Sequence, residues 1–147
     1  MSRGRKDVVA LARDWIGTPY VHQASCRGGG ADCLGLLRGI WRGLGMVEPE
    51  EAPPYAPDWS EPQGEERLWA AARRHLVEKP LYSEARGDVL LFRMRSSGVA
   101  KHLGIAARIG RDPSFVHAYT GHGVVESPLS APWRRRIVAR FSFPEGY

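Results

Sequence analysis

The sequence predicts an α+β protein in which helices precede an antiparallel sheet. In the first half of the 147-residue chain, apolar residues recur at helical spacing, whereas the second half is a series of short apolar runs separated by turn residues. Strands that follow helices in blocks, instead of alternating with them, indicate segregated helices and strands. The length corresponds to one domain, so we expect a single domain over residues 1–147.

Three helices are expected in the first half, at residues 4–16, 32–44 and 65–78. Gly17 and Pro19 end the first helix, and Pro80 follows the third. The segment 48–64 between the second and third helices is acidic and rich in proline, and it predicts a long irregular loop.

About five strands are expected in the second half, at residues 87–92, 102–109, 114–119, 124–127 and 135–143. The turn sequences GRDP (110–113) and TGHG (120–123) connect three of them as hairpins. The basic cluster at 134–136 is expected to be a solvated approach to the last strand.

The composition excludes several classes of protein. The chain is 43% hydrophobic and 25% charged, as in ordinary globules, and no apolar run reaches the roughly 20 residues that span a bilayer. We therefore expect no membrane insertion. The basic N-terminus lacks an apolar core and a cleavage site, so we expect synthesis in the cytoplasm without a signal peptide.

The net charge of +5 is scattered, without aromatic–basic interleaving, so we expect no nucleic-acid partner. The two cysteines, Cys26 and Cys33, lack the spacing of a zinc site, and nothing requires a disulfide between them. We therefore expect neither a metal nor another cofactor.

The stretch RGGGADCLGLLRGIW (27–41) places Cys33 in the first turn of a helix, after a glycine-rich loop. The unpaired amides and the dipole of a helix N-terminus favour negative charge, which predicts a lowered thiol pKa and a reactive thiolate. Such a thiolate should react with iodoacetamide at neutral pH ahead of Cys26. The glycines at 28–30 would let a substrate backbone approach, and the Cys33 amide could donate to an oxyanion.

A cysteine nucleophile needs a base and a residue that orients the base. The histidines that could serve are His22, His75, His102, His117 and His122. A symmetric hairpin centred on residues 111–112 would place Ala106 opposite His117, so that His102 and His117 project from one face. They would remain offset along the strands, and a bulge or an asymmetric turn would be needed to bring them together.

Five motifs occur in the order GTPY (17–20), ADCLGLL (31–37), GDVLLF (87–92), HLGIAARI (102–109) and FVHA (115–118). In this order they resemble the NlpC-type cell-wall endopeptidases of the papain-like superfamily. The stretch WIGTPYVHQASCRGGGADCLGLL (15–37) is most similar to the subgroup encoded with phage tail genes and in gene transfer agents.

The resemblance implies a papain-like fold with the nucleophile at a helix N-terminus. It assigns the nucleophile to Cys33, the base to His102 and the third polar residue to His117. It also assigns two substrate-binding residues, Tyr20 and Asp32. The implied reaction is hydrolysis of peptide bridges in peptidoglycan, commonly at the γ-D-glutamyl–diaminopimelate bond.

The subgroup implies phage-tail or baseplate proteins as partners. It places the protein on a virion tail or similar particle that acts in the periplasm of the target cell. One departure bears on the substrate: Leu34 stands where many members of the family have a serine. Two other classes of protein remain open, namely a non-catalytic tail or baseplate component with the same fold and a nucleic-acid-binding protein, which only the net charge suggests. Among enzymes, an amidase or acyltransferase would use the same residues.

Overall fold

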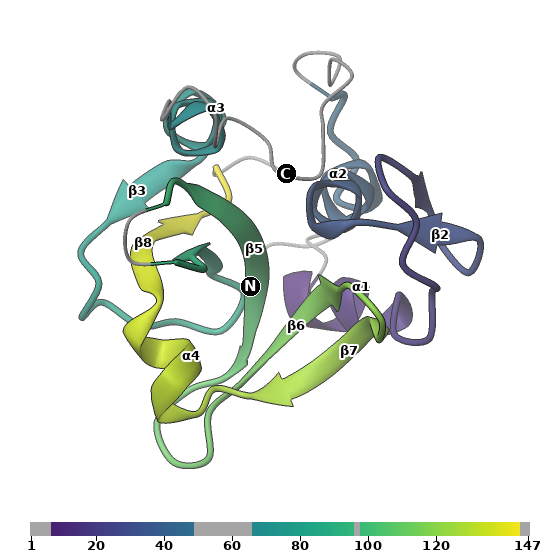
Figure 1. Cartoon of the computed structure of the whole chain (residues 1–147). Helices are drawn as coiled ribbons and strands as arrows, with labels where there is room; N and C mark the ends of the chain where they lie inside the picture. Colours follow the sequence, from purple (N-terminus) through teal and green to yellow (C-terminus); the bar gives the residue numbers. More distant parts are fainter. Residues whose placement is uncertain (1–6, 49–65, 96–97, 145–147) are drawn as a thin grey trace.

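The computed structural model describes residues 7–48, 66–95 and 98–144. The chain first forms α1 (Val8–Asp14), a two-stranded ribbon of β1 (Ser25–Cys26) and β2 (Gly30–Ala31), α2 (Cys33–Gly43) and α3 (Arg67–His75). Six strands then build the main sheet: β3 (Val77–Lys79), β4 (Val89–Arg93), β5 (Ala100–Arg108), β6 (Ser114–Tyr119), β7 (Gly123–Pro128) and β8 (Ile137–Ser142). A short helix, α4 (Ala131–Arg135), precedes β8 (Figure 1).

The main sheet has the strand order β3-β8-β4-β5-β6-β7, and all neighbouring strands are antiparallel. The predicted α+β class, with helices before an antiparallel sheet, is therefore confirmed. In the described part of the chain, no helix has the length and apolar character needed to cross a bilayer.

Each face of the sheet has its own apolar cluster. On one face, α1, α2 and α3 pack against Leu91, Leu103 and Ile105 of the central strands. On the other face, Phe92 and Phe115 form a smaller cluster, against which Trp133 of α4 packs. The sheet curves around α4 (Figure 1). The central strand β5 is buried on both faces. Its side chains alternate between the two faces as predicted, but each face lies against an apolar cluster, and neither face is exposed to solvent.

The structure corrects three predicted element boundaries. The first helix spans Val8–Asp14, where 4–16 was predicted, because Asp7 caps its N-terminus through the Val9 amide. The third helix ends at His75 and not at residue 78, because residues 77–79 pair with β8 as a sixth strand. The basic cluster at 134–136 begins inside α4, which the sequence analysis missed. The predicted loop 48–64 lies outside the described residues apart from Glu48.

The β5–β6 hairpin contains the irregularity that His102 and His117 require. Ala106 pairs with Phe115 and not with His117 as predicted, because the register shifts by a bulge between Ala106 and Arg108. Extending this register places His117 opposite Gly104, two residues from His102. A side chain at Gly104 would collide with the Phe115 ring, 2.8 Å from the position of its Cβ.

Candidate active site

Cys33 is the first residue of α2, at the point where β5 and β6 separate. The ladder between these strands begins at Ile105–Val116, and the strands diverge on the side where α2 lies (Figure 1). The Cys33 thiol donates a hydrogen bond to the Lys101 carbonyl, with an Sγ–O distance of 3.8 Å. The nucleophile predicted from the sequence therefore lies beside the backbone of the strand that carries His102.

Backbone amides face the Cys33 sulfur, yet the net effect of the site is to keep the thiol neutral. Burial raises the pKa of Cys33 to about 12, and the Asp32 carboxylate adds to the rise. The amides of Leu103, Leu34 and Cys33 lower the pKa but do not outweigh burial. The predicted lowering of the thiol pKa by the helix N-terminus is therefore wrong for the free protein, because desolvation is the larger effect.

His102 and His117 form a hydrogen-bonded pair on the concave face of the sheet. His102 Nε2 lies 2.8 Å from His117 Nδ1, which confirms the predicted placement on one face. His102 is 8% exposed and His117 is fully buried. Burial lowers the pKa of His102 to about 3, with a further contribution from His117. Burial likewise lowers the pKa of His117 to about 4, with a smaller contribution from His122.

Aromatic rings surround the pair. The Trp133 ring centroid lies 5.7 Å from that of His102 and 5.1 Å from that of His117. Phe92 packs against His102 at 5.6 Å, and Phe115 packs against His117 at 4.1 Å. These rings exclude water from the hydrogen bond between the histidines, which is the physical cause of their low pKa values.

Tyr20 lies near Cys33. It forms an isolated bridge with Ala31, two residues before Cys33. Burial raises the pKa of its phenol, a hydrogen bond with Thr120 opposes this rise, and the charges of Cys33 and Asp32 add to it. The Tyr20 side chain is thus placed between the nucleophile and the turn after β6, and its contact with substrate stays a prediction.

Asp32 has a structural role in this geometry. Its Oδ1 accepts a hydrogen bond from the Gly35 amide at 2.7 Å and caps α2, and its Oδ2 accepts one from the Gln23 amide at 2.7 Å. The carboxylate is buried, and it joins the helix that begins with Cys33 to the preceding loop. Its predicted contact with substrate is not tested by these bonds and stays a prediction.

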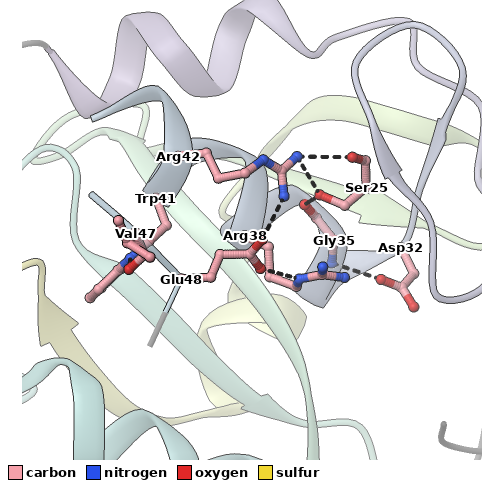
Figure 2. A network of polar contacts seen from close by, with 8 residues as sticks. All are labelled: Ser25, Asp32, Gly35, Arg38, Trp41, Arg42, Val47 and Glu48. Atoms are coloured by element: carbon pink, nitrogen blue, oxygen red, sulfur yellow. Dashed lines mark hydrogen bonds and ion pairs between the residues drawn. The ribbon is translucent and has the colours of Figure 1, made fainter. Parts of the chain in front are cut away.

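A polar network holds the glycine-rich hairpin against α2 (Figure 2). The Ser25 hydroxyl donates to the Gly35 carbonyl at 2.6 Å, and Arg42 donates to both the carbonyl and the hydroxyl oxygen of Ser25 at 2.9 Å. A Cβ at Gly35 would lie 1.8 Å from the Ala24 carbonyl oxygen. The loop and the helix N-terminus are therefore closely docked on each other beside Cys33.

The remaining candidates lie outside the pair. His122 stacks on Tyr119 with ring centroids 5.3 Å apart, and His22 Nδ1 lies 3.9 Å from Asp32 Oδ2. His75 lies at the end of α3, and Cys26 is exposed in the β1–β2 ribbon. Among the described residues, no group of three or more histidine, cysteine or acidic side chains is placed to hold a metal ion.

Two residues that complete the site were missed by the sequence analysis. Ser127 Oγ lies 2.9 Å from His117 Nε2, and Trp133 covers the histidine pair from α4. The signal for Ser127 was its position two residues beyond the one that pairs with His117, which places both on one face. In the sequence, Trp133 falls between the segments that form β7 and β8, and no pattern around it predicts a contact with the histidines.

Comparisons with solved structures agree with this architecture. The chain is similar to an NlpC/P60 family protein from Bacillus cereus, with a TM-score of 0.64 and 20% identity over 93% of this chain and 39% of that one. It is also similar to a protein from Staphylococcus aureus described as similar to lipoprotein, NLP/P60 family, with a TM-score of 0.63 and 16% identity over 99% of this chain and 46% of that one.

A third structure, of Ly7917, has a TM-score of 0.57 and 16% identity over 94% of this chain and 62% of that one. The chain thus spans between 39% and 62% of the length of these proteins. No protein-family model and no curated protein sequence matches it. At these identities the comparisons establish the fold, which is that of NlpC/P60 family proteins.

Proposed function

We propose that the protein is a cysteine endopeptidase that hydrolyses the peptide stems of peptidoglycan. The observation that carries the proposal is the 2.8 Å hydrogen bond between His102 Nε2 and His117 Nδ1, beside the strand residue whose carbonyl holds the Cys33 thiol. A nucleophile, a base and a group that orients the base are the parts that covalent acyl transfer needs. The similarity of the fold to NlpC/P60 family proteins supports the same proposal.

The reaction would proceed through a thioester. The Cys33 sulfur attacks the carbonyl carbon of the scissile amide while its proton passes to His102 Nδ1, and the Cys33 amide donates to the oxyanion. The C–N bond then breaks, and the leaving amine takes the proton from His102. Water attacks the thioester and gives a proton to His102, the C–S bond breaks, and Cys33 recovers its proton as the acid leaves.

The electrostatics of the free site indicate when the proton moves. Burial keeps the Cys33 thiol neutral, with a pKa of about 12, and keeps His102 neutral, with a pKa of about 3. A resting thiolate–imidazolium pair is therefore disfavoured. We expect proton transfer to accompany attack on the bound substrate, with the oxyanion stabilised as it forms.

The bond and the route of delivery rest on the sequence resemblance. We propose the γ-D-glutamyl–diaminopimelate bond as the site of cleavage. We also propose that a phage tail or gene transfer agent carries the protein into the periplasm of the target cell, where it helps the particle to cross the wall. The proposed partners are tail or baseplate proteins, so the protein should co-purify with assembled particles. Its recovery only as free protein would contradict this part of the proposal.

Digestion of purified peptidoglycan tests the activity. The protein should release muropeptides whose masses identify the cleaved bond, and the Cys33→Ser variant should release none. Cys26→Ser is the matched control and should retain activity, since Cys26 is exposed and lies outside the site. Equal release by the Cys33→Ser variant would overturn the proposal.

The alternative is a non-catalytic tail or baseplate component with this fold. The observation that favours it is that partial burial raises the pKa of the Cys33 thiol to about 12, which disfavours the thiolate at neutral pH. A binding component would sediment with intact peptidoglycan without changing its muropeptides, and the Cys33→Ser variant would bind equally well. The digestion above therefore distinguishes the two functions.

A further inference from the structure

The hydrogen-bond chain of the site does not end at His117. His117 Nε2 lies 2.9 Å from the Ser127 hydroxyl oxygen, so His102, His117 and Ser127 form a continuous chain across β5, β6 and β7. Val125 pairs with His117, and Ser127 lies two residues further along β7 on the same face. The chain thus crosses three neighbouring strands on the concave side of the sheet.

The protons in this chain are coupled. Only one proton can lie between His102 Nε2 and His117 Nδ1 when both rings are neutral. If His102 supplies it, His102 Nδ1 has a free lone pair, and the proton of His117 is on Nε2 and points at Ser127. If His117 supplies it, His102 is protonated on Nδ1 and cannot accept a proton from a thiol. The role of the Ser127 hydroxyl therefore differs between the two arrangements.

We propose that Ser127 is a positioning residue whose hydroxyl oxygen accepts the hydrogen bond from His117 Nε2–H. This bond holds the pair in the tautomer that leaves His102 Nδ1 free to act as the base. The inference rests on the proposed function, because only a general-base role for His102 requires that tautomer.

Burial explains why the acceptor matters. His117 is fully buried, and a buried N–H group without an acceptor is destabilised by the loss of its hydration. Ser127 is partly exposed, so its own hydroxyl hydrogen can point to water while its oxygen accepts from His117.

The neighbouring acidic residue does not compete for this role. The Glu126 carboxylate is already bound by Arg13 at 2.9 and 3.1 Å and by the Ser114 hydroxyl at 2.6 Å. Residues alternate between the two faces of a strand, so Glu126 projects away from the face that carries Ser127. Ser127 is therefore the polar side chain of β7 that reaches the histidine pair.

The test reads the tautomers directly. Nitrogen-15 NMR of histidine-labelled protein, without substrate at neutral pH, distinguishes protonated from unprotonated ring nitrogens. In the wild-type protein we expect His102 to be protonated on Nε2 with Nδ1 free, and His117 to be protonated on Nε2. In Ser127→Ala both rings should shift toward the Nδ1-protonated tautomer, and Ser127→Thr, which keeps the hydroxyl, should restore the wild-type pattern.

Kinetics on a soluble muropeptide provide a second readout. Loss of one hydrogen bond of this kind should lower kcat about tenfold in Ser127→Ala with little change in KM, and Ser127→Thr should recover most of the rate. Ser142→Ala on β8 is the matched control, since Ser142 is also a partly buried strand serine and pairs with Val77 far from the histidines.

A wild-type His102 protonated on Nδ1 would overturn the inference, even if Ser127→Ala fails to fold. So would an unchanged tautomer in a folded Ser127→Ala variant. The tautomers are measured without substrate. Tautomers that respond to Ser127 in a protein that does not cleave peptidoglycan would therefore contradict the proposed function alone.

Discussion

Cys33 shows how two local effects compete at one residue. The amides at the start of α2 and the Leu103 amide favour a thiolate, but burial and the Asp32 carboxylate raise the pKa of the thiol to about 12. In the proposed reaction the helix N-terminus would stabilise charge as it forms, and it does not create a thiolate beforehand. This arrangement has a direct consequence for reactivity toward small electrophiles.

We expect iodoacetamide at pH 7 to modify exposed Cys26 before Cys33, the reverse of the order expected from sequence. The rate at Cys33 should rise about tenfold per pH unit in the alkaline range, because the thiolate is the reactive form. Peptide mapping after brief labelling measures both sites, and the unfolded protein, in which both cysteines should react, is the control. Faster labelling of native Cys33 than of Cys26 at pH 7 would show that the thiol is ionised.

The two histidines of the pair should contribute unequally to catalysis. General-base catalysis supplies roughly 10²- to 10⁴-fold, so His102→Ala should lose at least that much in kcat/KM. His117→Asn keeps a polar partner for His102 and should retain a measurable part of the rate, whereas His117→Ala should retain less. Kinetics on a soluble muropeptide, with folding checked by circular dichroism, measure the three variants. An active His102→Ala variant would exclude His102 as the base.

Two placements in the candidate site were predictable from local rules. The helix pattern placed Cys33 at a helix N-terminus, and strand parity placed His102 and His117 on one face, as the structure shows. Their catalytic roles came from the family resemblance and stay predictions. The same reasoning could not weigh burial against the helix N-terminus, because the depth of the thiol depends on residues from β5 that are distant in the chain. Trp133 was missed because its contact with the histidines also joins residues that are distant in the chain.

At the scale of elements, the position of Cys33 depends on how tightly α2 is docked against the loop before it. Gly35 allows this contact, because a Cβ there would lie 1.8 Å from the Ala24 carbonyl oxygen, which belongs to the backbone and cannot move aside alone. The Asp32 cap and the Ser25 hydroxyl hold the same segment through the amide and the carbonyl of Gly35.

Gly35→Ala should therefore lower both the melting temperature and the activity, since the loop and the start of α2 must separate. Gly43→Ala is the matched control on the same helix. Its Cβ would meet the flexible end of Leu11 at 3.1 Å, and alanine has the higher helix propensity. Thermal unfolding and muropeptide release measure both variants. A Gly35→Ala variant as stable and active as the wild type would contradict the close docking.

The elements themselves were predictable where the pattern is local. The helix that begins at Cys33 and the strand at Ser114–Tyr119 agree closely with their predicted ranges. Val77 and Glu78 of the strand Val77–Lys79 were assigned to the end of a helix, because only pairing with β8 makes this segment a strand. The hairpin register also depends on a bulge; the sequence indicated that a bulge or an asymmetric turn was needed but could not say which or where.

At the scale of the whole molecule, folding encloses two histidines that would ionise readily in the unfolded chain. The apolar cluster around Phe92 and Phe115 and the covering ring of Trp133 lower the pKa of His102 to about 3 and that of His117 to about 4. Their ordinary value is 6.5. Burying these two histidines in the neutral form therefore makes the free energy of unfolding depend on pH, and the folded state loses stability as the pH falls.

The sign of that cost follows from linkage. Between about pH 6.5 and the folded-state pKa values of about 3 and 4, the unfolded chain binds protons on both histidines and the folded chain does not. The free energy of unfolding should therefore decrease as the pH falls through this range, and above pH 6.5 these groups should add no pH dependence. Denaturant unfolding at a series of pH values measures this slope.

The double variant His102→Asn, His117→Asn is the control, because it lacks both imidazoles but keeps the carboxylates, which also titrate at low pH. Its free energy of unfolding should therefore decrease less steeply over the same pH range. Equal slopes for the wild type and the double variant would show that the buried pair is protonated in the folded state.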